Sequence, residues 1–408
     1  MTALLAAALL TGCASLPEMH ELTDEVAIAT AELAAVVSHA LDPEPGDAEP
    51  AAVAADPGHR GAQKRPSIPL AVHKTPASQP TTVGPPPPAY SREGSRREVR
   101  DWAALDASVR RLPRPASMEE LARSLSALGR DEWERTRALH VWLTQNIAYD
   151  TASFFSGRIP PQTPESVFRS GAAVCAGYAE LFARVGTLMG LNVRVVSGYA
   201  KGYGYRAGTR FTGTNHAWNA VYLAGSWHLF DATWGAGHIN GRAFVRSYTD
   251  FWFDPPPELM LRTHLPERSE WQLVERPITL REFEAHAHIP SHALTGLFEL
   301  GTPDARVIQA LDSGDGLPAA DRPRHPAVRV TSVPIRATLR AGQPYHFNLS
   351  LPPGAEAAVI NNSTWHRLVA SDDRWTVSVT PARGELQLAV RTDPASRNYW
   401  TVLQYRVE

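Results

Sequence analysis

A proline- and alanine-rich stretch divides this chain of 408 residues into two very different parts. Residues 42–100 contain runs such as GPPPPAY (Gly84–Tyr90) and few large apolar side chains. A segment of that composition cannot bury a hydrophobic core, and it is typical of a semi-extended, disordered linker. A folded domain therefore has to be built almost entirely from the residues that follow position 100.

The first residues of the chain form an apolar run, MTALLAAALLTGC, that ends at Cys13. The order of an apolar run, small residues and a cysteine resembles a bacterial lipoprotein signal over residues 1–13. This resemblance implies a lipid on Cys13 that anchors the protein to a membrane of the bacterial cell envelope, facing the periplasm or the cell surface. The alternative is a short buried apolar segment. Residues 14–41 that follow have apolar side chains at helical spacing and predict a helix.

Composition limits the class of partner. Hydrophobic residues make up 43% of the chain and charged residues 20%, as in globular proteins. The net charge of −2 provides no electrostatic basis for binding nucleic acid. The chain has two cysteines, so lipidation of Cys13 would leave Cys175 without a disulfide partner. Cys175 is then either an inert buried thiol or a reactive one.

Helical and alternating patterns follow one another after residue 100, which predicts an α+β domain over residues 101–290. We expect helices at Met118–Leu128, at Asp131–Asn146 and after Cys175, a strand at Leu191–Tyr199 and a hairpin from His216 onward. Residues 291–325 are weakly patterned and read as a connector. Residues 326–408 contain several short alternating runs separated by turn residues, which are typical of a small all-β sandwich.

Cys175 stands where the small residues of SGAAVCAG turn into an apolar helix. A thiol in the first turn of a helix lies near unpaired backbone N–H groups and the positive end of the helix dipole, and both favour the thiolate. The backbone amide of Cys175 could also help to hold an oxyanion. A lone cysteine is nevertheless most often a buried structural residue, so this site needs further residues to support it.

Two alternating runs in the sequence NHAWNAVYLAGSWHLFDATWGAG supply those residues. They predict a hairpin with strands His216–Tyr222 and Trp227–Thr233 and a four-residue loop, in which Tyr222 faces Trp227. In that register His216 and Asp231 are diagonal neighbours on one face of the sheet. A three-residue loop would place them on opposite faces. The pattern thus predicts a His–Asp pair, although each residue alone could be an ordinary strand-end histidine or a turn cap.

The motifs RALHVWLTQNIAYD, AAVCAGYAELF, NHAWNAVYLAGSWHLFDATWGAG and FWFDPPPELMLRTHLPERSEWQLV together resemble the transglutaminase-like superfamily, in particular its kyphoscoliosis-peptidase branch. The resemblance implies a papain-like core with a helix-borne cysteine packed on an antiparallel sheet. It also implies that Cys175 is the nucleophile, His216 the general base and acid, and Asp231 the residue that orients His216. Trp218, Asn219, Trp142 and Tyr149 match motif positions and are candidates for supporting the site or lining the substrate cleft, with core packing the more ordinary role for Trp142.

The activity implied is a cysteine peptidase or amidohydrolase that acts on a peptide or protein. A crosslinking transglutaminase and a non-catalytic envelope binding protein are the alternatives, because some branches of the superfamily lack the three residues. His286, His288 and His292 do not have the spacing of a recognised zinc site. We therefore expect no metal and no cofactor.

Overall fold

The computed structural model describes residues 100–298, 328–371 and 374–408. The proposed signal at residues 1–13, the helix at 14–41, nearly all of the linker at 42–100 and most of the connector at 291–325 lie outside the described residues. Within the described part of the chain, no helix has both the length and the apolar character needed to cross a membrane.

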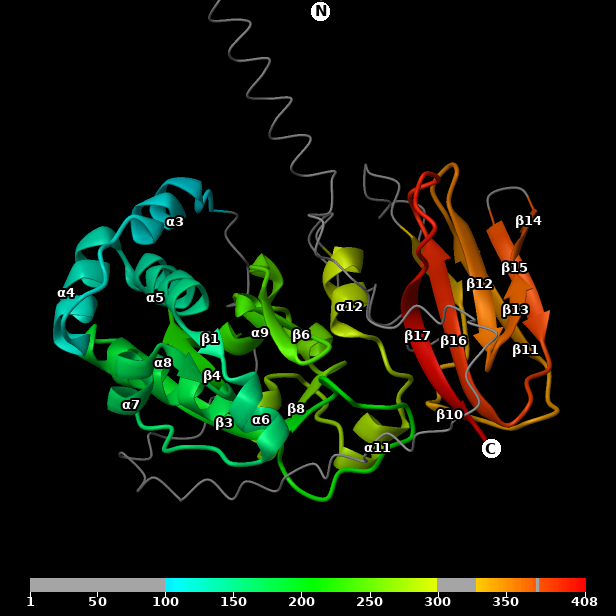
Figure 1. The fold of residues 1–408 in the computed structure, drawn as a ribbon, viewed down its shortest axis with the longest axis horizontal. Helices are drawn as coiled ribbons and strands as arrows, with labels where there is room; N and C mark the ends of the chain where they lie inside the picture. The colour runs from blue at the N-terminus through cyan, green and yellow to red at the C-terminus, as the bar shows by residue number, and fades with distance from the viewer. Residues whose placement is uncertain (1–99, 299–327, 372–373) are drawn as a thin grey trace, which may run out of the picture. The chain divides into compact units, whose positions relative to one another are not determined.

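Helices make up most of residues 100–190 (Figure 1). Two of the predicted helices begin at a side-chain cap. Ser117 caps α4 and Asp131 caps α5, and each side chain accepts a hydrogen bond from a first-turn backbone N–H. The helices are α3 (Ala103–Arg110), α4 (Met118–Leu128), α5 (Glu132–Asn146), α6 (Thr151–Ser156), α7 (Pro164–Ser170), α8 (Cys175–Leu188), α9 (Ala232–Ala236), α10 (Pro257–Met260), α11 (Leu280–Ala285) and α12 (Ser291–Phe298).

An antiparallel sheet of four strands in the order β5-β4-β3-β8 carries these helices. Its strands are β3 (Asn192–Ala200), β4 (His216–Leu223), β5 (Ser226–Phe230) and β8 (His264–Pro266). Helix α8 packs on β3 and β4, and α5 lies beside α8 (Figure 1). Fully buried side chains such as Phe182 of α8, Val221 of β4 and Phe230 of β5 form the core between them.

The hairpin of β4 and β5 has the predicted register but a shorter loop. Tyr222 pairs with Trp227 as expected, and Leu223 pairs with Ser226, so the turn contains only Ala224 and Gly225. Both turn residues have positive φ, 47° and 89°, as a two-residue hairpin turn requires. The predicted second strand was too long, because it ends at Phe230 and residue 231 begins the cap of α9. The alternation of apolar and polar residues that predicted a strand up to Thr233 continues past the end of β5 into the first turn of α9.

Short strands complete the first region. β1 (Ala148–Tyr149) pairs in parallel with β2 (Ala172–Ala173), and β6 (Gly237–Asn240) forms a hairpin with β7 (Ala243–Arg246). The β1–β2 pairing is important for the site, because it places the end of α5 beside the loop that leads into α8.

The C-terminal region is built from β strands in two sheets (Figure 1). One sheet has the order β10-β17-β16-β12-β13 and the other β14-β15-β11-β9. Their strands are β9 (Arg329–Ser332), β10 (Thr338–Leu339), β11 (Tyr345–Ser350), β12 (Glu356–Asn361), β13 (Thr364–Arg367), β14 (Val369–Ser371), β15 (Arg374–Val379), β16 (Gly384–Arg391) and β17 (Trp400–Val407). Phe347, Leu349, Val359, Leu386 and Leu388 are buried in the core of this region. The chain is thus an α+β core followed by a β-rich region, as the patterns predicted.

Candidate active site

Cys175 is the first residue of α8, at the position that the sequence predicted. The N-cap residue before it, Val174, has no side chain that could accept a hydrogen bond from the first-turn N–H groups. The positive end of the helix therefore remains available to a thiolate. The backbone N–H of Val174 donates to Oε1 of Gln162, 3.0 Å away, and this contact fixes the approach of the chain to the thiol.

His216 is the first residue of β4 and pairs with Gly198 of β3. Gly198 also pairs with Pro266 of β8, so three strands meet closely at this point. A Cβ on Gly198 would lie 2.2 Å from the carbonyl oxygen of Leu265 and 2.6 Å from the ring of Trp218. Glycine is required here because any side chain would push apart the strands that carry His216.

Asp231 is the N-cap of α9 and is completely buried. Its Oδ1 accepts hydrogen bonds from the backbone N–H groups of Thr233 (2.8 Å) and Trp234 (3.0 Å). Its Oδ2 lies 2.7 Å from Nε2 of His216. The two roles that the sequence left as alternatives, a cap and a partner of His216, are therefore performed by the two oxygens of one carboxylate.

The three predicted residues, Cys175, His216 and Asp231, lie together in the structure. Nε2 of His216 lies 2.7 Å from Oδ2 of Asp231, and Cys175 lies near enough to His216 to help raise the pKa of the imidazole. Since Nε2 is already engaged, Nδ1 is the nitrogen available to the thiol. This arrangement of thiol, imidazole and carboxylate can generate a thiolate and move a proton.

A second histidine, His264 of β8, joins the same carboxylate and was missed by the sequence analysis. Its Nε2 lies 3.1 Å from Oδ2 of Asp231. His216 lies opposite Gly198 and His264 opposite Ala200, two positions apart on β3, so both rings point to the same face of the sheet. The signal was weak, because β8 joins the sheet only after a long excursion that no local pattern predicts.

Burial and the ion pair act in opposite directions on these groups. Burial alone would lower the pKa of His216, but Asp231 and the contact with Cys175 raise that pKa well above its usual range. Burial alone would raise the pKa of Asp231, but His216 and His264 hold it well below its usual range. Burial lowers the pKa of His264 to about 4, despite its hydrogen bond to Asp231. The site thus favours a charged His216, an ionised Asp231 and a neutral His264.

His216, Asp231 and His264 are also the one group of the described residues whose donor atoms could converge on a metal ion, since those atoms lie within 4.8 Å of one another. The donor chemistry does not fit this use well. A metal needs the lone pair of each Nε2, whereas both nitrogens face an oxygen of an ionised carboxylate and so carry their protons. Hydrogen bonding accounts for the cluster.

The part of the chain that contains the site matches a known protein family. Residues 119–232, which include Cys175, His216 and Asp231, match the profile of the transglutaminase-like superfamily. The core of this chain is transglutaminase-like.

The relatives share this core over part of their length. "Kyphoscoliosis peptidase" of Mus musculus is 36% identical over 190 residues, which are 46% of this chain and 29% of that protein, and the Homo sapiens protein of the same name matches equally. "Hillarin" of Drosophila melanogaster is 33% identical over 180 residues, 40% of this chain and 22% of that protein. The chain therefore spans less than a third of these relatives. A solved structure described as a TGase overlaps 38% of each chain at 21% identity, with a TM-score of 0.23 that is too low to support an argument.

The four motif residues predicted around the transglutaminase-like site have different positions. Trp142 is 2% exposed and stacks on Phe168 in the core of α5, α7 and α8, so it does not line a substrate cleft. Trp218 is buried against the rings of His216 and His264 and forms a wall behind them. Asn219 donates its side-chain N–H to the carbonyl of Ala179 (3.0 Å) and so ties β4 to α8. These three support the site from inside the core.

Tyr149 is the exception among the four. It pairs with Ala173 two residues before the thiol, and its side chain is only half-buried. Burial and the nearby Cys175 raise its pKa well above the usual value, so the phenol remains neutral beside the site. Tyr149 is therefore the motif residue best placed to meet a substrate.

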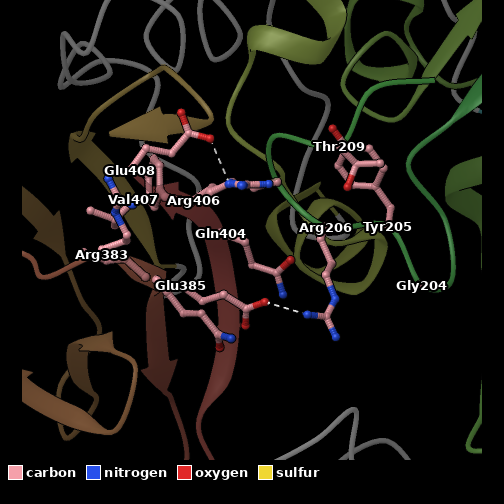
Figure 2. Close-up of a pocket in the computed structure, with 15 residues that line it drawn as sticks. Gly204, Tyr205, Arg206, Thr209, Arg383, Glu385, Gln404, Arg406, Val407 and Glu408 are labelled. Carbon is pink, nitrogen blue, oxygen red and sulfur yellow. Dashed lines mark hydrogen bonds and ion pairs between the residues drawn. The ribbon is translucent and has the colours of Figure 1, made fainter. Parts of the chain in front are cut away.

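A separate cleft of about 740 Å³ lies between the loop that follows β3 and the strands β16 and β17 (Figure 2). Its walls carry two ion pairs, Arg206 with Glu385 and Arg406 with Glu408, each at 3.0 Å. Neither a thiol nor an imidazole is among the residues that line it. The candidate site at the start of α8 is therefore separate from this cleft.

Proposed function

We propose that this protein is a thiol-dependent enzyme that acts on amide bonds, in its simplest form a cysteine peptidase or amidohydrolase. The observation that carries the proposal is the contact series from Cys175 to His216 to Asp231, with the thiol at an uncapped helix start. The transglutaminase-like core and its relatives named peptidases support the same reaction class. The substrate class proposed is a peptide or protein of the bacterial cell envelope.

In the first half of the proposed reaction, the Cys175 thiolate attacks the amide carbonyl carbon and forms a C–S bond. The carbonyl oxygen becomes an oxyanion, for which the backbone N–H of Cys175 is one donor. His216 then gives its proton to the leaving nitrogen as the C–N bond breaks. The amine departs, and a thioester remains on Cys175.

In the second half, an acceptor attacks the thioester while His216 takes its proton. The C–S bond breaks and the thiolate returns. With water as the acceptor the product is a carboxylic acid, and with a primary amine it is a new amide. We favour water, because it is the default acceptor and the described residues provide no evident site for an amine.

The first test replaces the nucleophile. We expect Cys175→Ala to abolish activity on a probe such as dimethylated casein, because Cys175 is the only cysteine among the described residues. The probe is incubated with and without a fluorescent primary amine, and mass spectrometry distinguishes cleaved, deamidated and amine-tagged peptides. Cys13→Ser is the matched control and should keep full activity. Turnover that persists in Cys175→Ala would exclude the mechanism.

The same assay separates the alternatives. Amine-tagged products in preference to hydrolysed ones would favour a crosslinking transglutaminase. An inert thiol would favour a binding protein, and alkylation by iodoacetamide measures this directly. A thiolate paired with His216 reacts well below pH 8, whereas an inert buried thiol does not.

We also propose that Cys13 carries a lipid that anchors the protein in the cell envelope, on the basis of the residues that surround it. Expression in a bacterium and membrane fractionation test this proposal. The protein should be in the detergent-soluble membrane fraction and become soluble without detergent in Cys13→Ser. An unchanged distribution would contradict the anchor.

A further inference from the structure

Asp231 binds two imidazoles through one oxygen. Oδ2 lies 2.7 Å from Nε2 of His216 and 3.1 Å from Nε2 of His264. Its other oxygen accepts the two backbone N–H groups of α9. The carboxylate therefore has four hydrogen bonds, and rotation about its Cβ–Cγ bond would break all of them.

The proton positions on His264 follow from its neighbours. An ionised carboxylate only accepts hydrogen bonds, so Nε2 of His264 must carry a proton. Because burial keeps this ring neutral, Nδ1 then carries a lone pair. Oγ1 of Thr263 lies 2.9 Å from Nδ1 and 3.4 Å from the carbonyl oxygen of Met260, so its hydroxyl can donate to the lone pair on Nδ1. Asp231 thus selects the tautomer of His264, and the Thr263 hydroxyl, which can donate or accept, pairs with the nitrogen on the opposite side of the ring.

Packing confines the ring in this orientation. His264 is 1% exposed. Its ring centroid lies 4.4 Å from that of Trp234, 5.1 Å from that of Trp252 and 5.2 Å from that of Trp218. Because its ring is confined, His264 can hold Oδ2 in one place by donating a hydrogen bond from Nε2. The neutral ring does this without adding a charge.

We propose that His264 is a positioning residue for the acyl-transfer reaction, which acts through Asp231 while Thr263 pairs with its other ring nitrogen. It fixes Oδ2 at the point where Nε2–H of His216 meets it, and this orients Nδ1 of His216 toward the Cys175 thiol. The inference rests on the proposed function and adds a fourth side chain to it. His264 lies outside residues 119–232, so the family match does not include it.

Other titratable groups face this network and must be considered in any measurement of it. Those whose charge acts on Asp231 or His216 come from α5, β1 and α8, and they are His140, Tyr149, Cys175 and Tyr178. None of them is altered in the variants below, so their influence is common to all.

The test compares three replacements of His264 by a readout that needs no substrate. Glutamine places its side-chain N–H close to the position of Nε2, whereas asparagine reaches only the position of Nδ1, and leucine has no donor. The rate of Cys175 alkylation by iodoacetamide at about pH 6 should fall roughly tenfold in His264→Leu and His264→Asn. It should remain within about twofold of the wild type in His264→Gln. At about pH 10, where any accessible thiol is ionised, all four proteins should react alike.

Thr263→Val and Thr263→Ser extend the test to the tautomer. Nitrogen-15 NMR of the imidazoles should show His264 as a single neutral tautomer, protonated on Nε2, in the wild type and in Thr263→Ser. Because Asp231 sets the tautomer, Thr263→Val should keep the proton on Nε2 and should lose less alkylation rate than His264→Leu.

Two results would overturn the inference. One is equal alkylation at pH 6 in the glutamine, asparagine and leucine variants. The other is a loss of thermal stability alone, with wild-type alkylation, which would make His264 a structural residue only. Either result leaves the proposed function intact if Cys175→Ala is inactive, so the failure of one proposal is distinguishable from the failure of the other.

Discussion

The candidate site depends on the side chain of Asp231. Asp231 caps α9 through Oδ1 and binds both imidazoles through Oδ2, so a single side chain connects backbone geometry to proton position.

Asp231→Asn should change the position of the proton on His216 more than it changes the backbone of the site. The amide oxygen can still cap α9, but its NH₂ group then faces His216 and favours the tautomer with the proton on Nδ1. That tautomer cannot accept the thiol proton, and we expect turnover of the casein probe to fall by about 10²- to 10⁴-fold. Asp254→Asn is the matched control, because it alters another His–Asp pair, with His228 at 3.0 Å. Equal losses in the two variants would contradict the assignment.

The raised pKa of His216 predicts how stability depends on pH. A group whose pKa is higher in the folded state stabilises the fold fully below its unfolded value of about 6.5 and loses that contribution as the pH rises through about 10. We therefore expect the difference in unfolding free energy between the wild type and His216→Gln to be largest near pH 6 and to shrink toward pH 10. Urea denaturation at several pH values measures it. A constant difference would mean that His216 is not held as the cation.

At the scale of elements, the close meeting of β4, β3 and β8 at Gly198 sets the distance between the two histidines. Gly198 pairs with His216 on one side and with Pro266 on the other, and its missing side chain lets Trp218 and the backbone of β8 approach. The site is therefore a product of strand packing and not only of the residues that contact substrate.

Gly198→Ala should damage fold and site together. A Cβ at this position would lie 2.2 Å from the backbone oxygen of Leu265, which cannot move without disturbing β8. We expect a loss of about 1–3 kcal/mol in unfolding free energy and slower alkylation of Cys175 at low pH. Ser197→Ala, at the exposed neighbouring position, should change neither. Wild-type stability and alkylation in Gly198→Ala would show that the strands can separate without consequence.

At the scale of the whole molecule, the region around α11 and α12 connects the transglutaminase-like core to the β-rich region. The backbone N–H of Ala337 donates to the carbonyl of Ala285 (2.8 Å), and Gln404 and His288 form a β-bridge. Helix α12 packs on β17, with Leu294 completely buried. One continuous set of buried side chains contains Trp218 of the first region and Leu403 of the second.

This shared core predicts that the two regions unfold together. Calorimetry should show a single transition, and Leu294→Ala should lower its midpoint by removing about 2–5 kcal/mol of unfolding free energy. Val369→Ala, at a position that is 69% exposed, is the control and should have almost no effect. Two separate transitions in the wild type would show that the regions are independent.

The sequence by itself determined the elements whose signals are local. Apolar residues at helical spacing predicted α4, α5 and α8 nearly to the residue, because that periodicity depends only on neighbours a few positions away. Alternation predicted β3 and the register of the hairpin, but Asp231 lies beyond the end of β5 and meets His216 from the cap of α9. The resemblance to a family then supplied roles that geometry alone could not.

Only the tertiary structure decided where distant segments meet. The entry of β8 beside β3 brought His264 to Asp231, and this pairing depends on packing between residues far apart in the chain. The burial of Trp142 in the core and the end of β5 at Phe230 were likewise decided by contacts across elements. The contacts of a side chain depend on which distant segments pack against it in the fold. A local sequence pattern carries information only about residues that are near in the sequence.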